Sequence, residues 1–303
     1  MKAKLTIALP VYNRTDFVKS ALDSAVNQTV PCSILLIDNN SPHDDFKKIV
    51  ESYKGVDIKY VKTKETVPQD ENFNNCFRFA DTPWVTVLHD DDMLHCQFVE
   101  FCQSILEKHG KDVGGIMAPS FVGEEEWPEV YTKKAITDDI KFVNQAYFFF
   151  NTVPFPGVLV DKDVALKIGG FNNLLHPIAD FDFWYRYSQE MPMVYINQQM
   201  AYYRISASQS TNNLMHDMIN NIYEYRLRLI KEGRQNNCLT RLGLEHARIE
   251  NIKYFQDTYV NLELPDTYVN ESAMKRARRL LSFPPLRKLV EKHKQHIAFS
   301  KAK

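Results

Sequence analysis

Glycine is scarce in this sequence, with ten residues among 303. Neither the GxGxxG pattern nor the GxxxxGKS/T pattern occurs in it. Rossmann dehydrogenases and P-loop enzymes bind phosphate groups with these glycine loops, so the absence of both patterns argues against both classes. If phosphate groups bind to this chain, a metal ion and side chains must neutralise them.

Long apolar runs and paired cysteines are also missing. No uncharged apolar run approaches the ~18–20 residues that a membrane-spanning helix needs. The first segment, MKAKLTIALPVYNR, is too short in apolar residues even for a signal peptide, and we interpret it as a buried strand of a cytosolic protein. The five cysteines are scattered without a CxxC pair, which is typical of reduced thiols rather than of disulfides or a zinc site.

The near-neutral charge hides an asymmetry along the chain. The formal net charge is −1, but residues 275–303 carry ten Lys and Arg residues and a single acid, Glu291. This segment therefore has a charge of +9, and the remaining 274 residues have a charge of −10. An acidic body with a basic tail indicates a partner or a function for the tail.

Apolar runs alternate with helical patterns in the first third of the chain. The runs at 5–9, 33–37, 58–61 and 84–88 are almost continuously apolar, as in strands covered on both faces. Between the first two, apolar residues recur at helical spacing from Val18 to Val26, and Thr15 is placed to cap that helix. This alternation predicts an α/β fold with a mainly parallel (mixed) sheet flanked by helices.

The C-terminal third has a different pattern. From about residue 212 the chain is helical in pattern, with interruptions at Pro265 and at the pair 284–285. We therefore predict two parts: a sheet domain over residues 1–211, and a helical C-terminal extension over 212–303 that ends in the basic amphipathic tail.

Polar clusters follow three of the predicted strands. They are Pro10-Val11-Tyr12-Asn13, then 38–41 with the sequence DNNS, then 89–92 with the sequence HDDD. Ligands of an open parallel sheet bind at the carboxyl ends of its strands, so these clusters predict a binding site. For Asp38 alone, a turn-capping role is an equal alternative.

Three consecutive carboxylates, Asp90, Asp91 and Asp92, point to a metal ion. Neighbouring carboxylates repel one another and raise each other's pKa unless a cation is present. Hard divalent ions such as Mg²⁺ bind one or two carboxylates together with phosphate oxygens and water, so this cluster predicts a metal–diphosphate site. The alternative is an acidic first turn of the following helix.

A second acidic pair lies in the segment ADFDFWYR. Asp180 and Asp182 are two residues apart, and on a helix they point to different sides, so only one of them can face a given site. The other is expected to cap the helix or form a salt bridge. Arg204 follows a late predicted strand and is a candidate to meet a phosphate group or to pair with an acid.

The order and spacing of these segments resemble the family-2 inverting glycosyltransferases of the GT-A fold. The resemblance covers about residues 4–210. It is carried by six segments in order: ALPVYNR, IDNNS, ENFNNCFRFADTPWVTVLHDDDML, GVLVDKDVALKIGGF, ADFDFWYR and YYRISASQS.

The resemblance implies a role for each matching residue. The nucleotide would lie near Asp38, and Asp90–Asp92 would hold the ribose and an Mn²⁺ or Mg²⁺ ion. Asp180 would be the catalytic base, with Asp182 as the competing candidate because Ala179 stands where the family has a Glu. Ser206 stands where the family commonly has His. The remaining nucleotide candidates are Pro10, Tyr12, Asn13 and Asn74, and the diphosphate candidates are Arg204 and Ser206.

The resemblance also implies the reaction. A sugar would pass, with inversion, from a nucleoside-diphosphate sugar, UDP-linked by family frequency, to a hydroxyl group of a saccharide or lipid-linked saccharide. Such hexosyl transfer (EC 2.4) would serve bacterial surface polysaccharides such as O-antigen, lipopolysaccharide or capsule. Trp184, one turn after Asp180, is the preferred acceptor contact. The aromatic run 147–150 and Phe155 are further candidates, with burial in the core as their alternative.

The basic tail predicts an anionic membrane surface as a partner. Lys and Arg residues accompany an apolar face made of Leu286, Leu289, Val290 and Ile297. A basic amphipathic helix of this kind can lie on anionic lipid, which would make the protein peripheral at the inner face of the plasma membrane. The alternatives are nucleic-acid binding, which we do not expect, and docking of the helix on the acidic body.

Two other functions compete with sugar transfer. A sugar-nucleotide pyrophosphorylase would also have an α/β sheet and metal-binding carboxylates, but it normally has a glycine-rich basic loop after the first strand, which VYNRTD lacks. A non-catalytic carbohydrate- or nucleotide-binding scaffold is the second alternative, because Ala179 and Ser206 depart from the family pattern.

Overall fold

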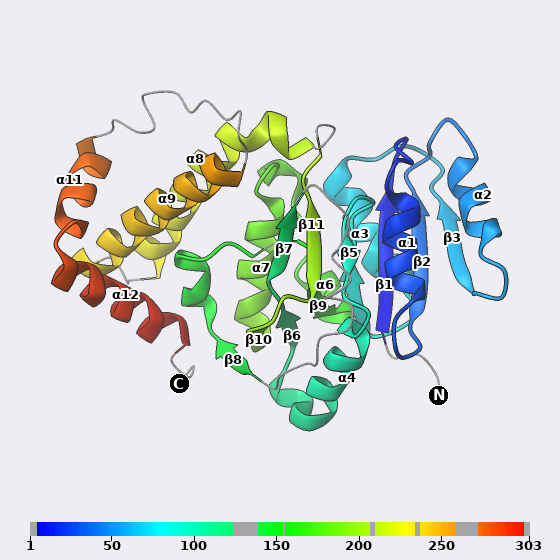
Figure 1. Ribbon diagram of the computed structural model, residues 1–303, viewed down its shortest axis with the longest axis horizontal. Coiled ribbons are helices and arrows are strands. Elements are labelled where there is room, and N and C mark those ends of the chain that lie inside the picture. Colours follow the sequence, from blue (N-terminus) through cyan, green and yellow to red (C-terminus); the bar gives the residue numbers. More distant parts are fainter. Residues whose placement is uncertain are drawn as a thin grey trace. The chain divides into compact units, whose positions relative to one another are not determined.

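A computed structural model of the chain describes residues 5–123, 139–153, 155–206, 210–233, 237–258 and 272–299 (Figure 1). The chain divides into two compact units. The first contains residues 1–142 and 153–207, and the second contains residues 143–152 and 208–303. The predicted domain boundary after residue 211 stays a prediction. The inclusion of 143–152 in the second unit was not anticipated from the sequence.

An eight-stranded sheet forms the centre of the first unit, in the order β3-β2-β1-β4-β9-β6-β10-β8. Strand β9 runs antiparallel to both of its neighbours, β4 and β6, whereas the neighbours of β1 and β2 are parallel. The predicted α/β fold with a mainly parallel sheet is therefore confirmed. The strands are β1 (Leu5–Val11), β2 (Ser33–Asp38), β3 (Ile58–Lys62), β4 (Trp84–Val87), β6 (Gly115–Met117), β8 (Ile140–Val143), β9 (Val158–Asp161) and β10 (Met193–Ile196).

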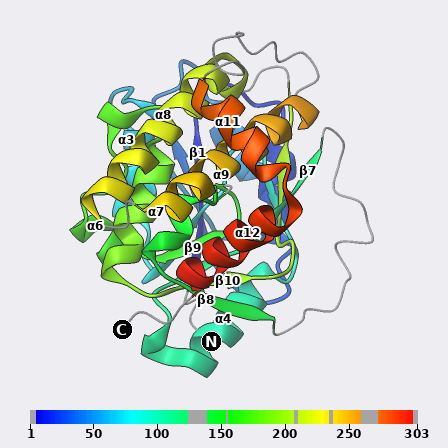
Figure 2. The ribbon, with the colours of Figure 1, turned by 90° about the vertical axis from the view of Figure 1, so that its left-hand side faces the viewer.

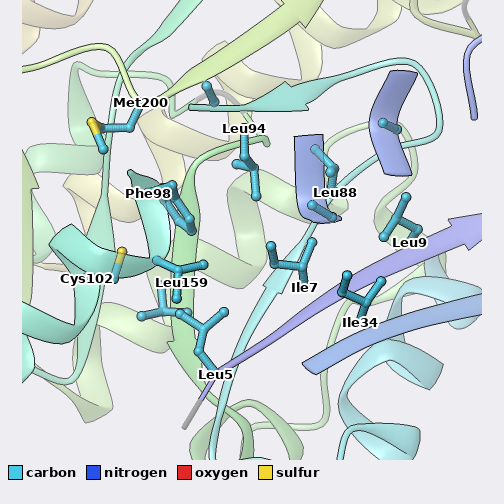
Figure 3. Close-up of a cluster of buried hydrophobic side chains, with 14 of the residues drawn as sticks. Leu5, Ile7, Leu9, Ile34, Leu88, Leu94, Phe98, Cys102, Leu159 and Met200 are labelled. Carbon is cyan, nitrogen blue, oxygen red and sulfur yellow. The ribbon is translucent and has the colours of Figure 1, made fainter. Parts of the chain in front are cut away.

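Alternating residues of β1 fix the two faces of the sheet. Leu5, Ile7 and Leu9 are buried in one cluster with Phe98 and Cys102 of helix α4 (Phe98–His109), as Figure 3 shows. Helices α1 (Val18–Val26) and α2 (Asp45–Ser52) add their apolar side chains to the same cluster. Side chains in between point to the opposite face, because successive residues of a strand alternate.

Three helices cover the opposite face: α3 (Gln69–Phe79), α6 (Lys162–Lys167) and α7 (Ala179–Glu190) (Figures 1 and 2). Helix α3 packs against β1, β2 and β4, and α6 packs against both α3 and α7. The short 3₁₀ segments of this unit are η1 (Gly110–Asp112) and η3 (Asn173–Leu175).

The predicted cap of α1 is wrong. The helix begins at Val18 with Phe17 as its N-cap residue, and no side chain caps it. The backbone carbonyl of Thr15, rather than its hydroxyl group, accepts the Val18 N–H at 3.4 Å. The chain makes a turn before the helix, and this turn satisfies the first N–H group with a backbone acceptor.

A second, three-stranded sheet has the order β5-β11-β7. Strand β11 (Ala201–Arg204) pairs antiparallel with β5 (Met93–Leu94) and parallel with β7 (Ser120–Gly123). Because β5 directly follows the acidic cluster, this pairing brings the end of β11 beside it.

Helices form the second unit: α8 (Ser210–Glu232), α9 (Cys238–Thr258), α11 (Ser272–Leu281) and α12 (Pro284–Phe299). The segment 143–152, which contains the 3₁₀ helix η2 (Gln145–Phe149), packs against α8 and α12. The guanidinium group of Arg226, fully buried in α8, donates to the Phe148 carbonyl at 3.1 Å. Among the described residues, no helix is both long and apolar enough to cross a membrane.

Candidate functional site

The three polar clusters lie at one edge of the sheet. Strands β1 and β2 are paired from Thr6 to Val11, so Val11 lies beside Asp38 at the carboxyl end of both strands. Strand β4 pairs with the other side of β1 in the same direction. Tyr12 therefore leaves the sheet at the edge where the acidic cluster begins.

Asp38 is fully buried and is held by hydrogen bonds. Its two carboxylate oxygens accept from the Ser41 N–H and from the Tyr60 hydroxyl group, each at 2.8 Å. Ser41 in turn accepts the N–H of Asn13 at 2.9 Å, so Asp38 fixes the loop after β1 through Ser41. Burial and the bond to Asp38 raise the pKa of Tyr60, which keeps its hydroxyl group protonated as the donor.

The residues at the end of β1 and just after it differ in their exposure to solvent. Pro10 lies within the strand and is buried, whereas the Tyr12 ring is 50% exposed. Asn13 has a φ of +60°, a conformation that Asn tolerates better than most residues. The loop therefore leaves both Tyr12 and Asn13 accessible at this edge.

Arg14 neutralises two of the three acids. Its guanidinium group pairs with carboxylate oxygens of Asp90 and Asp91, at 2.8 Å in the case of Asp91. Burial by itself lowers the pKa of Arg14, but the hydrogen bonds and the charges of both acids overcome this effect and raise it. Sequence reasoning did not single out Arg14, although it closes the PVYNR segment.

Asp92 is the most deeply buried acid of the cluster, with no exposed surface. One of its oxygens accepts the backbone N–H of Arg204 at 3.0 Å; the other has no hydrogen-bond partner among the described residues and lies 3.5 Å from the His89 Nδ1 atom. Burial, together with the charge of Asp91, raises the pKa of Asp92 well above its ordinary value. A buried carboxylate oxygen in this position fits a cation that supplies the missing interaction.

Arg204 supports the acidic cluster from β11. Its side chain donates to the backbone carbonyl of Asp91 at 3.0 Å and lies over the Phe17 ring, 4.6 Å from the ring centre. The side chain is only 4% exposed. Arg204 therefore holds the acidic loop in place, and Ser206, two residues later, is partly buried.

His89 joins the acids as a third potential metal ligand. Ligand atoms of His89, Asp91 and Asp92 lie within 4.8 Å of one another. The imidazole ring packs against Phe73 and Phe155, with ring centres 5.1 and 4.3 Å away, and its Nε2 atom has no hydrogen-bond partner among the described residues. Burial lowers the pKa of His89 to about 4, so the ring is neutral and able to coordinate.

This donor set fits a divalent cation. One neutral imidazole and two carboxylates suit Mn²⁺, and the carboxylates suit Mg²⁺ as well. The sequence contained a signal for His89, because it stands directly before the three acids at the end of a strand. The sequence analysis predicted the three carboxylates as metal ligands and did not include His89.

Asp180 lies in the first turn of helix α7, close enough to Asp70 of α3 for the charge of Asp70 to affect its pKa. Burial raises the pKa of Asp180 to about 6, and the charge of Asp70 adds to the shift. The Phe181 N–H donates to one of its oxygens at 2.7 Å. Asp70 itself pairs with the His176 imidazole at 3.2 Å, so an acid–histidine pair accompanies the candidate base.

Asp182 has a different environment. Its carboxylate accepts from Arg186 at 2.7 Å, and Arg186 also donates to the backbone carbonyls of Ile168 and Gly170. The two acids therefore have separate partners, as their spacing predicted. Asp182 fastens α7 to the end of α6, which favours Asp180 as the acid that meets a ligand.

Asn74 connects α3 to the loop after α6. Its amide group both accepts the Phe171 N–H at 2.7 Å and donates to the Phe171 carbonyl at 3.0 Å. Gly170, with a φ of +68°, passes so close that a Cβ atom there would lie 2.1 Å from the Asn74 oxygen. Asn74 therefore positions a loop beside the site.

The aromatic candidates are buried. Trp184 is 3% exposed, and its indole N–H has no hydrogen-bond partner among the described residues. Its ring packs edge-on against Phe155 and Phe171, and Phe155 contacts His89, so ring contacts connect α7 with the acidic cluster. The side chains at 147–150 are also buried, in agreement with the core alternative for that run.

Comparison with known proteins gives one family and several relatives. Residues 6–157, half of the chain, match the model of glycosyl transferase family 2. An uncharacterized glycosyltransferase from Haemophilus influenzae is 23% identical over 270 residues, which cover 84% of this chain and 90% of that protein.

Two solved structures share the fold. The structure of S. aureus TarS 1–349 in complex with UDP-GlcNAc has a TM-score of 0.60 and 12% identity, with 97% of this chain and 83% of that chain covered. This chain spans 50% of the longer TarS structure. A mannosyltransferase from Pyrobaculum calidifontis, in complex with GDP-Man and Mn²⁺, has a TM-score of 0.54 and 11% identity, with 98% and 85% covered.

Proposed function

This chain belongs to glycosyl transferase family 2 and has the fold of the GT-A glycosyltransferases, and we propose that it is an inverting, metal-dependent hexosyltransferase. The donor is a nucleoside-diphosphate sugar, UDP-linked, and the acceptor is a hydroxyl group of a saccharide. The observation that carries this proposal is the acidic cluster after β4, where a buried oxygen of Asp92 has no hydrogen-bond partner among the described residues. The UDP-GlcNAc bound to the TarS structure supports the choice of donor.

His89, Asp91 and Asp92 would hold the divalent cation, Mn²⁺ or Mg²⁺. Their ligand atoms lie close enough together to share one ion, and the neutral imidazole adds a nitrogen donor to the carboxylates. When bound, the cation would stabilise the negative charge that develops on the diphosphate leaving group. The Mn²⁺ in the Pyrobaculum calidifontis mannosyltransferase structure supports this assignment.

Asp180 is our proposed catalytic base. An acceptor hydroxyl group has a pKa far above neutrality, so a carboxylate must accept its proton as it attacks the sugar. A pKa of about 6 leaves Asp180 ionised at neutral pH and makes it a stronger base than an ordinary Asp. Attack from the face opposite the leaving group inverts the anomeric carbon. Asp182 is the weaker candidate because Arg186 already pairs with its carboxylate.

The nucleotide would bind at the edge formed by the ends of β1 and β2. The exposed Tyr12 ring can stack on the base, and Asn13, together with the buried Asp38, would shape the pocket beside it. Asp90 would contact the ribose. Pro10 and Asn74 would also contact the nucleotide, and Arg204 and Ser206 would contact the diphosphate.

The acceptor would be a saccharide or lipid-linked saccharide of a bacterial surface polysaccharide, such as O-antigen, lipopolysaccharide or capsule. The relative from Haemophilus influenzae supports a bacterial role. Trp184 is the proposed acceptor contact, through its unpartnered indole N–H; the ring and the N–H are both buried, so the contact requires the site to open locally. A lipid-linked acceptor would place the enzyme at the inner face of the plasma membrane.

A thermal-shift screen of UDP, dTDP and GDP, each with and without Mn²⁺, tests the donor and the metal together. A ligand that binds only the folded state raises the melting temperature, by an amount that grows with the logarithm of the ratio of its concentration to its dissociation constant. We expect a shift with UDP that requires Mn²⁺ and that is lost in Asp92→Asn. Asp112→Asn, which changes an exposed carboxylate in η1, should behave like the unchanged protein.

Product analysis tests the reaction itself. Slow Mn²⁺-dependent release of a nucleoside diphosphate from one sugar nucleotide of a panel is the expected result. If no nucleoside diphosphate changes the melting temperature and none is released, the chain is a non-catalytic scaffold. Formation of sugar nucleotide from sugar phosphate and nucleoside triphosphate would instead identify a pyrophosphorylase.

A further inference from the structure

The apolar face predicted for the C-terminal tail is only partly buried: Val290 faces the protein, whereas Leu289 is exposed. Val290 is fully buried and packs in a cluster with Ala277 and Leu281 of α11, against side chains of α9. The Ile297 carbonyl accepts from Asn144 at 2.7 Å within the same unit, and the Ile297 side chain is partly buried. A helix lying on lipid with this face would have to leave α9 first.

Leu289 of that face is exposed together with two apolar side chains where α11 ends and α12 begins. Leu280, Phe283 and Leu289 are 51%, 61% and 50% exposed. They are three of the eight large hydrophobic side chains that the described residues expose, and they fall within ten residues of one another in the chain. The other five are distributed from Tyr12 to Tyr254 along the chain, and no other stretch of ten described residues holds three of them.

Cations surround these side chains. Arg279 immediately precedes Leu280, and Lys288 and Lys292 flank Leu289 on the side of α12 opposite Val290; all three cations are exposed. The one acid between residues 272 and 299 is Glu291, whose carboxylate pairs with Arg287 at 3.0 Å. The α11–α12 surface, made of Leu280, Phe283, Leu289, Arg279, Lys288 and Lys292, is therefore both apolar and strongly positive.

We propose that the α11–α12 surface binds an anionic membrane, with Phe283 and the two leucines inserted between the headgroups. Lipid headgroups attract the cations, while the apolar side chains enter the boundary with the acyl chains. Nucleic acid would use the cations but leaves an exposed Phe and two Leu residues without a role. The surface keeps its contacts to α9 when it binds, because Val290 and Ala277 face the other way. This proposal does not depend on the sugar-transfer reaction.

Co-sedimentation of the full chain with vesicles tests the proposal. The vesicles are phosphatidylcholine alone, or phosphatidylcholine with one-third phosphatidylglycerol. The full chain should bind the anionic vesicles and release them as salt concentration rises. Arg279→Glu with Lys288→Glu should weaken binding more than tenfold, because each near-surface charge changes affinity about fivefold. Leu280→Ser with Phe283→Ser should weaken binding to a similar extent.

Matched controls separate the surface from general effects. Lys231→Glu changes an exposed cation of α8 in the same unit, and Leu174→Ser removes a side chain that is 92% exposed in the other unit. Both should bind vesicles like the unchanged chain. The substituted side chains are exposed, so circular dichroism should show every variant folded.

Three results would overturn the proposal. The first is unchanged vesicle binding in both double variants, or no binding by the unchanged chain. The second is light scattering that shows a dimer which Phe283→Ser separates, since the surface would then join two copies. The third is binding of duplex DNA or RNA that Arg279→Glu with Lys288→Glu abolishes and Leu280→Ser with Phe283→Ser does not. Nucleotide-sugar binding, measured in parallel, reports on the proposed function separately.

Discussion

At the scale of single residues, Asp180 and Asp182 differ in their partners. Asp182 is neutralised by Arg186, whereas Asp180 has a raised pKa and no cationic partner at salt-bridge distance among the described residues. We expect Asp180→Asn to lower the transfer rate by about 10²–10⁴-fold, the usual contribution of a general base. UDP and Mn²⁺ binding, measured by calorimetry, should stay nearly unchanged.

Asp182→Asn is the matched control for this prediction. It keeps the size of the side chain and removes the ion pair with Arg186, so it should lower the melting temperature while keeping most activity. The reverse pattern, with Asp182→Asn inactive and Asp180→Asn active, would reassign the base.

The carboxyl group of Asp180 should also set the pH dependence of the transfer reaction. Because the pKa of Asp180 is about 6 in the folded protein, kcat/KM should rise with pH through about 6 and level off above it. The raised pKa also affects stability. The folded chain binds this proton more tightly than the unfolded chain, so the contribution is present below pH 3.8 and is lost as the pH rises through 6.

Asp180→Asn should therefore stabilise the protein at pH 7.5 and not at pH 3.5. The expected gain in the free energy of unfolding is about 1–3 kcal/mol, because one pKa unit corresponds to about 1.4 kcal/mol. Urea unfolding at the two pH values measures it. Equal effects at both pH values would show that Asp180 ionises normally.

We expect His89 to let the chain discriminate between metal ions. Imidazole nitrogen binds Mn²⁺ well, whereas Mg²⁺ prefers oxygen ligands. His89→Leu should weaken Mn²⁺ binding about tenfold or more and change Mg²⁺ binding little, as measured by titration calorimetry with UDP present. Phe73→Leu, which removes a ring packed on His89 but no ligand, should keep the Mn²⁺ preference. If His89→Leu weakened Mn²⁺ and Mg²⁺ binding equally, the His89 ring would have a packing role and would not be a metal ligand.

At the scale of elements, the end of α6 depends on two adjacent glycines. Gly169 and Gly170 both have a positive φ, +84° and +68°, and their N–H groups bond to carbonyls of the last turn of α6. A Cβ atom at Gly169 would meet nothing within 4 Å, whereas one at Gly170 would collide with Asn74. The first change therefore costs backbone strain alone, and the second also breaks the contact between α3 and Phe171.

Gly169→Ala should lower the free energy of unfolding by about 1–2 kcal/mol, the cost of a left-handed conformation for a residue with a Cβ atom. Gly170→Ala should cost at least about 3 kcal/mol, since Asn74 would lose both hydrogen bonds to Phe171. Chemical denaturation of both variants measures the difference. Equal costs would show that Asn74 moves aside without loss.

The elements differ in how far the sequence predicted them. The helix of ADFDFWYR, the strands β1, β2 and β4 and the helical C-terminal region follow from apolar periodicity, which is a local property. The prediction for the start of α1 was wrong because Thr is a common N-cap residue and Thr15 stands shortly before the helix. Either its hydroxyl group or a backbone carbonyl can accept the first N–H group of the helix, and the packing of neighbouring elements decides which one does.

At the scale of the whole chain, the segment 143–152 belongs to the compact unit of the C-terminal helices. The Arg226 guanidinium group holds its backbone at Phe148, and Lys294 lies over the Phe150 ring, 5.7 Å from the ring centre. The predicted boundary after residue 211 would separate this segment from α8, α9 and α12.

A chain of residues 1–211 should therefore aggregate when produced alone. It would expose the buried aromatic side chains of 147–150, and exposed apolar patches of this kind promote association. Light scattering and the soluble yield measure this effect. The same fragment with Phe148→Ser and Phe149→Ser should be more soluble. A monomeric 1–211 fragment that binds UDP would show that the boundary at 211 is functionally sound.

The sequence by itself determined the α/β class, the strands β1 to β4 and the edge at which Asp38 and the three acids lie. These features depend on local periodicity and on the rule that parallel strands end at the same edge. Only the tertiary structure decided which partner each polar group has. Arg14 meets Asp90 and Asp91, Arg204 meets the Asp91 carbonyl, and Asn74 meets Phe171, because contacts between residues distant in the chain depend on how the elements pack.

In the C-terminal tail, too, the sequence determined some features and the tertiary structure decided others. Its charge and its apolar residues were visible in the sequence, but the choice of inward and outward faces was not. Val290 turns inward because α9 offers a complementary apolar surface, and this leaves Phe283 at the corner between α11 and α12 exposed. A helical pattern specifies that one side is buried, and the packing of its neighbours specifies which side that is.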